Sequence, residues 1–176
     1  MEFKRWFLII CLISLFGESS AFNSNKTTIG FRTGTSENEM RGSFNQYEIF
    51  IARALPLDII ISSKVALRPR MEVSIASLVG ESKTGYYSTV GTITTVDFAN
   101  NPISIEVGSS FTFLNKYEYE QVNIGGLFHF ISHIGISLKL YQHIRTTFRF
   151  QHMSNAGIRQ PNPGINLNIW EINYSF

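Results

Sequence analysis

From about residue 27 onward, apolar and polar side chains alternate with a period of two, not the 3.6 residues of a helix. In the clearest stretch, 103–113, most odd positions are apolar, whereas the even positions are polar or glycine. The stretches 128–140 and 170–176 repeat this alternation. Because successive side chains of a β-strand point to opposite faces, each stretch predicts a strand with one apolar and one polar face.

This alternation predicts eight antiparallel strands, of which the first is the least well marked. Asn100-Asn101-Pro102 and Gln142-His143 have the composition of tight turns. The segment 57–68 fits either an extension of a strand or an extra loop. The predicted strands span about 27–35, 44–55, 70–80, 86–99, 103–114, 126–141, 145–154 and 166–176.

A membrane barrel and a soluble lipid-carrying barrel would both show this rhythm, but with opposite faces inside. The apolar faces hold many large aromatic residues, while Glu106, Lys139, Arg149 and Glu171 occupy the other face. A charged interior with a bulky apolar exterior is typical of outer-membrane barrels. The terminal Tyr174-Ser175-Phe176 also resembles their assembly signal. We therefore expect an all-β, eight-stranded transmembrane barrel, too narrow for a pore.

The first 21 residues are typical of a secretory signal peptide. Lys4 and Arg5 precede an apolar run at 7–16, and Ser19-Ser20-Ala21 offers small residues for cleavage. A membrane-anchor helix is the alternative, but it needs roughly 20 apolar residues. Residues 22–176 are then expected to form one barrel domain. The only cysteine of the full sequence, Cys11, would leave with the signal peptide, so no disulfide framework is expected.

Composition excludes some function classes. The chain has a net charge of +2 and no basic cluster, so no nucleic-acid partner is expected. Its 14% aromatic content suits a wall with one face in lipid. His129 and His133 share the inward face but lie roughly 13 Å apart along a strand. That separation is too large for a shared metal, and no cofactor motif is present, so neither metal nor cofactor is expected.

One pair of residues has the chemistry of an ester hydrolase. His152 and Ser154 are two apart on a predicted strand and share the face of Phe148 and Phe150. A serine becomes a nucleophile when a neighbouring imidazole takes its proton. An arbitrary His-x-Ser pair more often lies at a strand end in the headgroup zone, where water solvates both side chains. Only the flanking sequence can distinguish this structural interpretation from the catalytic one.

The flanking sequence resembles the PagL family of outer-membrane lipid A 3-O-deacylases. The resemblance rests on His152-Met153-Ser154-Asn155-Ala156-Gly157 and on the following Gln160-Pro161-Asn162-Pro163-Gly164-Ile165. It implies a Ser-His-acid triad on the outer surface of an eight-stranded barrel. On that basis His152 is the base, Ser154 is the nucleophile, and Asn155 and Gly157 lie in the oxyanion hole.

The third triad position departs from the family pattern, because Asn166 stands where the family has a glutamate. An asparagine oxygen can orient an imidazole but cannot supply the full negative charge that stabilises an imidazolium. Asn166 could equally be a turn-exit residue without a catalytic role. Glu171 has the opposite parity and should point into the barrel.

The resemblance implies a serine hydrolase that removes the 3-O-linked acyl chain of lipid A. Lipid A or lipopolysaccharide would be its substrate, and the outer membrane its location. A homodimer is allowed but not required. The alternative is an inactive barrel with a structural or binding role, for which Asn166 is the best argument.

Overall fold

The computed structural model describes residues 26–36, 43–120 and 122–176. The predicted signal peptide at 1–21, with Cys11, lies outside the described residues. No helix among the described residues is long and apolar enough to span a membrane.

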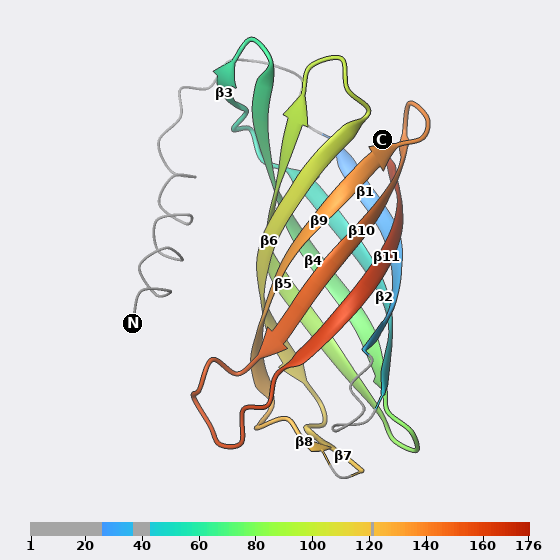
Figure 1. Cartoon of the computed structure of the whole chain (residues 1–176), viewed down its shortest axis with the longest axis vertical. Helices are drawn as coiled ribbons and strands as arrows, with labels where there is room; N and C mark the ends of the chain where they lie inside the picture. Colours follow the sequence, from blue (N-terminus) through green and yellow to red (C-terminus); the bar gives the residue numbers. More distant parts are fainter. Residues whose placement is uncertain (1–25, 37–42, 121) are drawn as a thin grey trace.

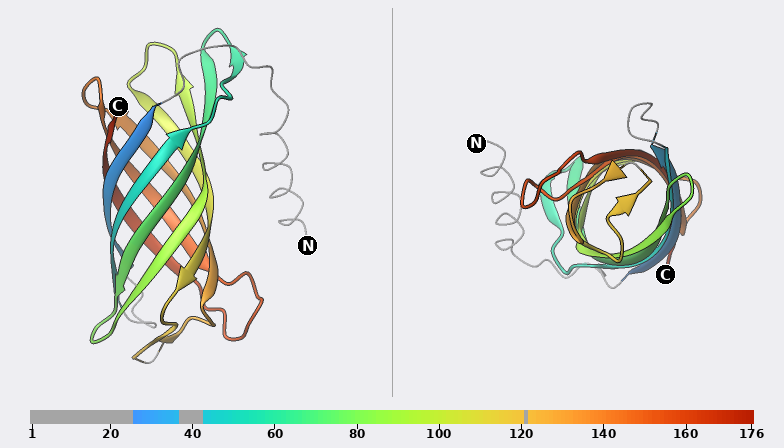
Figure 2. Two further views of the ribbon diagram at one scale, coloured as in Figure 1. Left: turned by 180° about the vertical axis from the view of Figure 1, so that it is seen from behind. Right: turned by 90° about the horizontal axis from the view of Figure 1, so that it is seen from below.

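Eight long strands close into a single antiparallel barrel (Figures 1 and 2). Around the barrel their order is β2-β1-β11-β10-β9-β6-β5-β4, and β4 pairs with β2 to complete the circle. This confirms the predicted fold. The strands are β1 (Thr27–Ser36), β2 (Phe44–Ala54), β4 (Val65–Val79), β5 (Thr84–Phe98), β6 (Ile103–Leu114), β9 (Phe128–Lys139), β10 (Ile144–Ser154) and β11 (Ile165–Ser175).

Two short hairpins lie outside this regular wall. The ambiguous segment 57–68 contains β3 (Ile59–Ser62), which pairs with the early residues of β4 and makes that strand start before the predicted residue 70. The connection between β6 and β9 contains β7 (Glu118–Tyr119) and β8 (Val122–Asn123), which pair with each other. Strands of two residues are too short to show a period, so the sequence pattern could not predict them.

The barrel has two distinct ends. Lys26 and Phe176 lie at one, here called the termini end, together with the β3–β4 hairpin and the short turn between β9 and β10 (Figure 1). The other, here called the loop end, holds the connections 115–127 and 155–164. Strand β10 runs toward the loop end, so its last residue, Ser154, lies there.

The outer wall is apolar, as the alternation predicts. Its side chains include Ile75, Ile136 and Trp170, which are 61%, 62% and 59% exposed. Phe148 and Trp170 pack against each other on neighbouring strands with ring centroids 4.9 Å apart. Exposed apolar side chains spread over a whole barrel wall require an apolar surrounding medium.

The interior is divided into an ionic part and an apolar part. Arg32 donates to Glu48 at 3.0 Å, to Glu72 at 2.6 Å and to Glu171 at 2.7 Å. Arg149 also pairs with Glu171, which points inward as its parity predicts. The apolar part is a buried cluster of Phe44, Ala76, Leu78, Tyr87, Leu114, Tyr119, Ile124, Ile131, Met153, Ile165, Leu167 and Ile169.

The ionic network should contribute measurably to stability. Glu171→Ala would leave the buried Arg32 and Arg149 without a shared carboxylate. Removing one partner of a buried ion pair costs about 3–5 kcal/mol. We expect a correspondingly lower free energy of unfolding in urea titrations of the detergent-solubilised barrel. Glu81→Ala, on an exposed loop, is the matched control, and equal midpoints for the two variants would contradict this role.

Candidate active site

The candidate residues come together where β10 ends and β11 begins. His152 is the register partner of Asn166 in the antiparallel pairing of these strands. The intervening residues point inward: Met153, Ile165 and Leu167 are all at most 4% exposed and belong to the apolar cluster. Because strand side chains alternate, burying these three residues turns the side chains of their neighbours outward.

His152 and Asn166 are joined by a direct hydrogen bond. His152 Nδ1 lies 2.6 Å from Asn166 Oδ1. An amide oxygen only accepts, so the imidazole donates from Nδ1, and in the neutral ring Nε2 is the nitrogen that can act as a base. Both side chains are exposed on the outward face. The structure thus brings together two of the three residues predicted for the triad.

Ser154 is the last residue of β10 and lies on the same face as His152. Its side chain is half-buried and its register partner on β9 is Phe130. Among the described residues, its hydroxyl makes no hydrogen bond with His152. The Ser154–His152 proton transfer therefore stays a prediction. Hydrogen bonds of this kind are often longer without substrate than in the reacting complex.

The turn after Ser154 is built around the buried side chain of Asn155. Its Nδ2 donates to the carbonyl oxygens of Gly125 at 2.7 Å and Arg159 at 2.9 Å. Its Oδ1 accepts the Gly157 N–H at 2.9 Å, and its own N–H donates to Asn162 Oδ1 at 3.1 Å. Asn162 thus has a structural role that sequence reasoning missed, although it lies within the motif.

Most backbone N–H groups of this turn already donate hydrogen bonds within the protein, which limits the donors left for an oxyanion. The N–H groups of Asn155 and Gly157 are already engaged, and Ile158 N–H donates to the Asn155 carbonyl at 3.1 Å. Ala156 is exposed and left-handed, with a φ of 54°. Its N–H makes no hydrogen bond within the described part of the chain. The oxyanion role of Asn155 and Gly157 stays a prediction.

Gly164 brings the returning chain against the imidazole of His152. Its φ is +66°, and a Cβ placed on it would lie 2.8 Å from His152 Cε1. Only a glycine combines this backbone conformation with so close an approach. Gly164 therefore limits the positions that the imidazole of His152 can take.

Gly164→Ala should test this positioning. The added methyl would push the imidazole or the loop aside, and displacements of about 1 Å near reacting groups can cost about 100-fold in rate. We expect a loss of that size in kcat of ester hydrolysis, with the circular dichroism of the barrel unchanged. The unfolding midpoint of the same variant in urea is the control for backbone strain, which would lower the stability of the barrel whether or not the imidazole moves. An unchanged kcat in Gly164→Ala would contradict steric positioning by Gly164.

The other histidines lie apart from this site. His129 Nε2 is 2.8 Å from the Ile124 carbonyl, and His133 Nε2 is 3.3 Å from Arg149 Nη1, both inside the barrel. His143 Nδ1 lies 2.8 Å from the Ser175 carbonyl in the turn after β9. Across the residues that the structure describes, no group of three or more His, Cys, Asp or Glu side chains could hold a metal ion.

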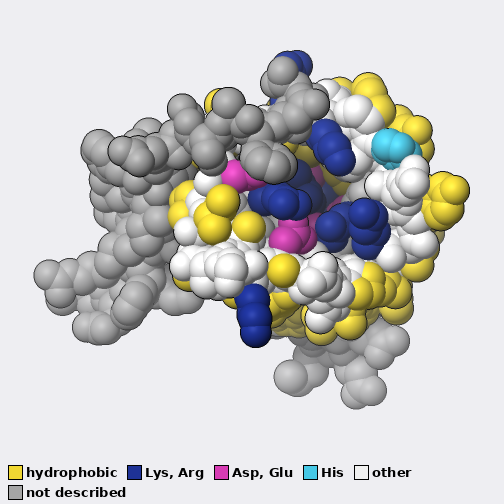
Figure 3. Space-filling view, turned by 90° about the horizontal axis from the view of Figure 1, so that it is seen from above, with side chains coloured by type: hydrophobic (Ala, Val, Ile, Leu, Met, Phe, Trp, Pro, Cys, Tyr) yellow, Lys and Arg dark blue, Asp and Glu magenta, His cyan; other side chains and the backbone are white. Residues whose placement is uncertain are grey.

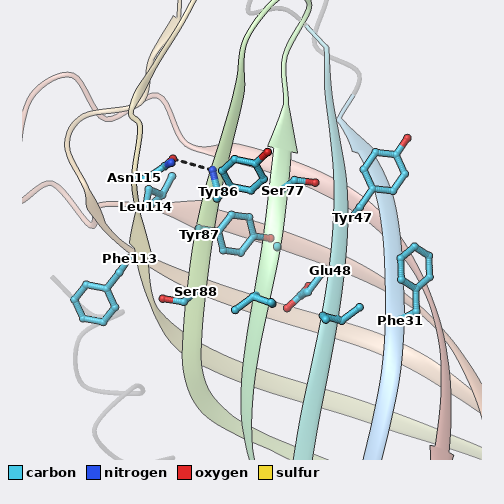
Figure 4. Close-up of a pocket in the computed structure, with 13 residues that line it drawn as sticks. Phe31, Tyr47, Glu48, Ser77, Tyr86, Tyr87, Ser88, Phe113, Leu114 and Asn115 are labelled. Carbon is cyan, nitrogen blue, oxygen red and sulfur yellow. Dashed lines mark hydrogen bonds between the residues drawn. The ribbon is translucent and has the colours of Figure 1, made fainter.

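The outer wall also carries a broad shallow hollow of about 680 Å³ over β1, β2, β4, β5 and β6 (Figure 4). Small outward side chains, Ser77 and Ser88, form its floor between the larger Tyr47, Tyr86 and Phe113. None of its lining residues comes from β10 or β11. The hollow is therefore separate from the candidate site.

Three comparisons relate the chain to known proteins. Residues 17–175 match the family described as Lipid A 3-O-deacylase (PagL). A curated relative, Lipid A deacylase PagL of Bordetella bronchiseptica, is 38% identical over 72 residues, which span 41% of this chain and 39% of the relative. The crystal structure of the outer-membrane enzyme PagL has a TM-score of 0.70, at 20% identity over 82% of this chain and 98% of that one.

Other solved barrels share the fold at lower similarity. The N-terminal barrel domain of Pseudomonas aeruginosa OprF has a TM-score of 0.56, at 9% identity over 87% of this chain and 98% of that one. Neisserial surface protein A has a TM-score of 0.55, at 10% identity over 88% of this chain and 98% of that one. These likenesses concern the fold alone. The barrel fold and its apolar outer wall support a location in the outer membrane. The match over residues 17–175 shows that the chain belongs to the PagL family of lipid A 3-O-deacylases, which are carboxylic ester hydrolases.

Proposed function

We propose that this chain hydrolyses the 3-O-linked acyl ester of lipid A. In this proposal Ser154 is the nucleophile, His152 is the base and Asn166 orients His152. The proposal depends chiefly on the 2.6 Å hydrogen bond from His152 Nδ1 to Asn166 Oδ1. That bond holds the imidazole in the tautomer that a general base needs, on the same strand face as a serine hydroxyl.

In the proposed reaction, Ser154 Oγ attacks the ester carbonyl while His152 Nε2 takes the serine proton. The imidazolium then protonates the sugar oxygen as the carbon–oxygen bond breaks, which releases the sugar hydroxyl and leaves an acyl-enzyme. A water molecule, deprotonated by the same imidazole, hydrolyses the acyl-enzyme and frees the fatty acid.

The turn after Ser154 is the proposed oxyanion site. The unengaged Ala156 N–H would donate to the developing negative charge. Asn155 and Gly157 would contribute by holding the turn, since the Asn155 side chain ties it to the carbonyls of Gly125 and Arg159. A preorganised donor of this kind needs a rigid turn, and the hydrogen bonds of the buried Asn155 side chain make this turn rigid.

The substrate would reach this site from the membrane. His152 shares the outward face with Phe148 and Phe150, which are 40% and 47% exposed, so we propose that the site faces lipid near the headgroup zone. Longer loops are usually extracellular in such barrels, which would place the loop end outside. A hollow of about 180 Å³ beside the turn is lined by Leu127, Phe128 and Ile158 together with Asn155 and one guanidinium, that of Arg159, and would suit an anionic amphiphile.

Export by a cleaved signal peptide at 1–21 belongs to the same proposal. Its support is the charged start, the apolar run and the small residues at 19–21. The intact mass of the protein purified from outer membranes would show whether cleavage follows Ala21. The homodimer that the sequence allows stays a prediction, which light scattering in detergent would test.

The direct test is mass spectrometry of lipid A from cells with and without the expressed protein. We expect lipid A to lose the mass of one 3-linked hydroxyacyl chain only when the protein is present. Lipid A that stays unchanged, with the barrel folded in the outer membrane, would contradict the proposal. It would favour the second candidate, an inactive relative with a structural or binding role, for which the neutral Asn166 is the specific observation.

A further inference from the structure

The mouth of the barrel at the termini end contains a second site-like feature. Two adjoining hollows of about 520 and 200 Å³ open there. They share Arg68, Asp97, Lys139 and Arg145 among their lining residues, so they form one connected region, here called the basic mouth. It lies at the opposite end of the barrel from Ser154.

The charges of the basic mouth are unbalanced. Its larger hollow is lined by Lys64, Arg68, Lys139 and Arg145 but by a single carboxylate, that of Asp97. Asp97 already accepts from Arg68 at 2.8 Å and from Arg145 at 3.5 Å, and Arg68 also lies 3.8 Å from Asp58, which does not line the hollow. Lys64 and Lys139 are exposed and have no ion-pair partner among the described residues. Figure 3, viewed from this end, shows Lys and Arg side chains gathered around the opening.

Apolar groups border the same cations. Ile60, Val65 and Phe98 line the larger hollow beside Lys64. Ile60 and Ile61, on the β3–β4 hairpin, are 66% and 62% exposed. Cations beside exposed aliphatic side chains fit an amphiphile better than a free, fully hydrated anion.

The height of this region on the barrel also suits a membrane interface. Tyr141, Tyr174 and Phe176 are 68%, 45% and 61% exposed at the termini end. Exposed aromatic residues typically mark the headgroup level of a membrane barrel. Basic pockets at this level bind the phosphate groups of anionic lipids.

We propose that the basic mouth binds the phosphate of an anionic phospholipid headgroup, with Lys64 and Lys139 as its free cations. Arg68 and Arg145, held in place by Asp97, complete the cationic rim. The acyl chains would lie along the exposed isoleucines of the β3–β4 hairpin. This binding is independent of ester hydrolysis at the loop end.

The test is native mass spectrometry of the full barrel released from micelles that contain phosphatidylglycerol or phosphatidylcholine. We expect a one-lipid complex with phosphatidylglycerol that is about tenfold tighter than with phosphatidylcholine. Lys64→Gln combined with Lys139→Gln should weaken it by about tenfold, because each lysine near an anionic headgroup contributes substantially. Both lysines are exposed, so the double variant should fold, which circular dichroism would verify.

The matched control removes two lysines from the loop end, Lys83→Gln with Lys116→Gln, and should leave phosphatidylglycerol binding unchanged. Inorganic phosphate at millimolar concentration should compete only weakly, because it lacks the acyl chains. Equal binding of the two lipids, equal losses in the two double variants, or full displacement by inorganic phosphate would each overturn the proposal.

Discussion

Ser154→Ala is expected to reduce release of the 3-O-linked acyl chain by at least about a thousandfold while the barrel stays folded. The variant would lack the proposed nucleophile, and losses of this size follow when a triad member is removed. The hydroxyl contributes no side-chain hydrogen bond within the described chain, so its loss should not change the unfolding midpoint. His152→Ala should cause a comparable loss. Mass spectrometry of lipid A and hydrolysis of a purified lipid A substrate would measure both.

The structure supplies a demanding control for this assignment. Ser132 on β9 is exposed and is the register partner of His152, so a second serine lies on the same outward face beside the imidazole. Ser132→Ala should retain most of the activity, because Ser132 is not followed by the turn that offers the Ala156 N–H. If Ser132→Ala were inactive and Ser154→Ala active, the nucleophile would be Ser132 and the proposed assignment would be wrong.

The barrel could be predicted from the sequence because each strand is long and has two chemically distinct faces. Seven of the eight predicted strands start within two residues of the observed start, even without any knowledge of pairing, as for Ile103–Leu114 and Ile144–Ser154. The start of β4 was missed because Val65, Ala66 and Leu67 are consecutive apolar residues without alternation. Their pairing with β3 is a matter of hairpin register, which a period of two does not specify.

The candidate site was only partly accessible to the same reasoning. Parity alone puts His152, Ser154 and Asn166 on outward faces, but register decides that His152 lies opposite Asn166. The position of Gly164 against the imidazole depends on the path of the 155–164 loop, which has no periodicity to read. The same is true of the bonds from Asn155 to Gly125 and Arg159, which join segments about 30 residues apart in the first case.

Asn166→Glu is expected to raise the rate at which the acyl chain is released from lipid A by about a hundredfold or more. The present amide orients His152 through one neutral hydrogen bond of 2.6 Å. A carboxylate at this position would also stabilise the imidazolium that forms when Ser154 loses its proton, and the reverse exchange in a serine protease costs about 10⁴-fold in kcat. Asn166→Ala should do the opposite, because the imidazole would lose its orienting partner. Initial rates of acyl release by each purified variant, at saturating substrate, would measure both effects.

Asn168→Glu is the matched control, because Asn168 lies on the same outward face of β11, two residues further along, with Phe150 and not His152 as its register partner. A new carboxylate there changes the surface charge equally but does not lie opposite the imidazole, so the rate should stay unchanged.

Together the variants show whether the native site is an active enzyme or an inactive relative. If the native chain is active and Asn166→Ala is not, the neutral amide suffices to orient the base. If only Asn166→Glu is active, the native chain has the geometry of a deacylase without the charge that its transition state requires. If neither substitution changes the rate of an active enzyme, the 2.6 Å contact has no part in catalysis, and the group that orients His152 must be sought elsewhere.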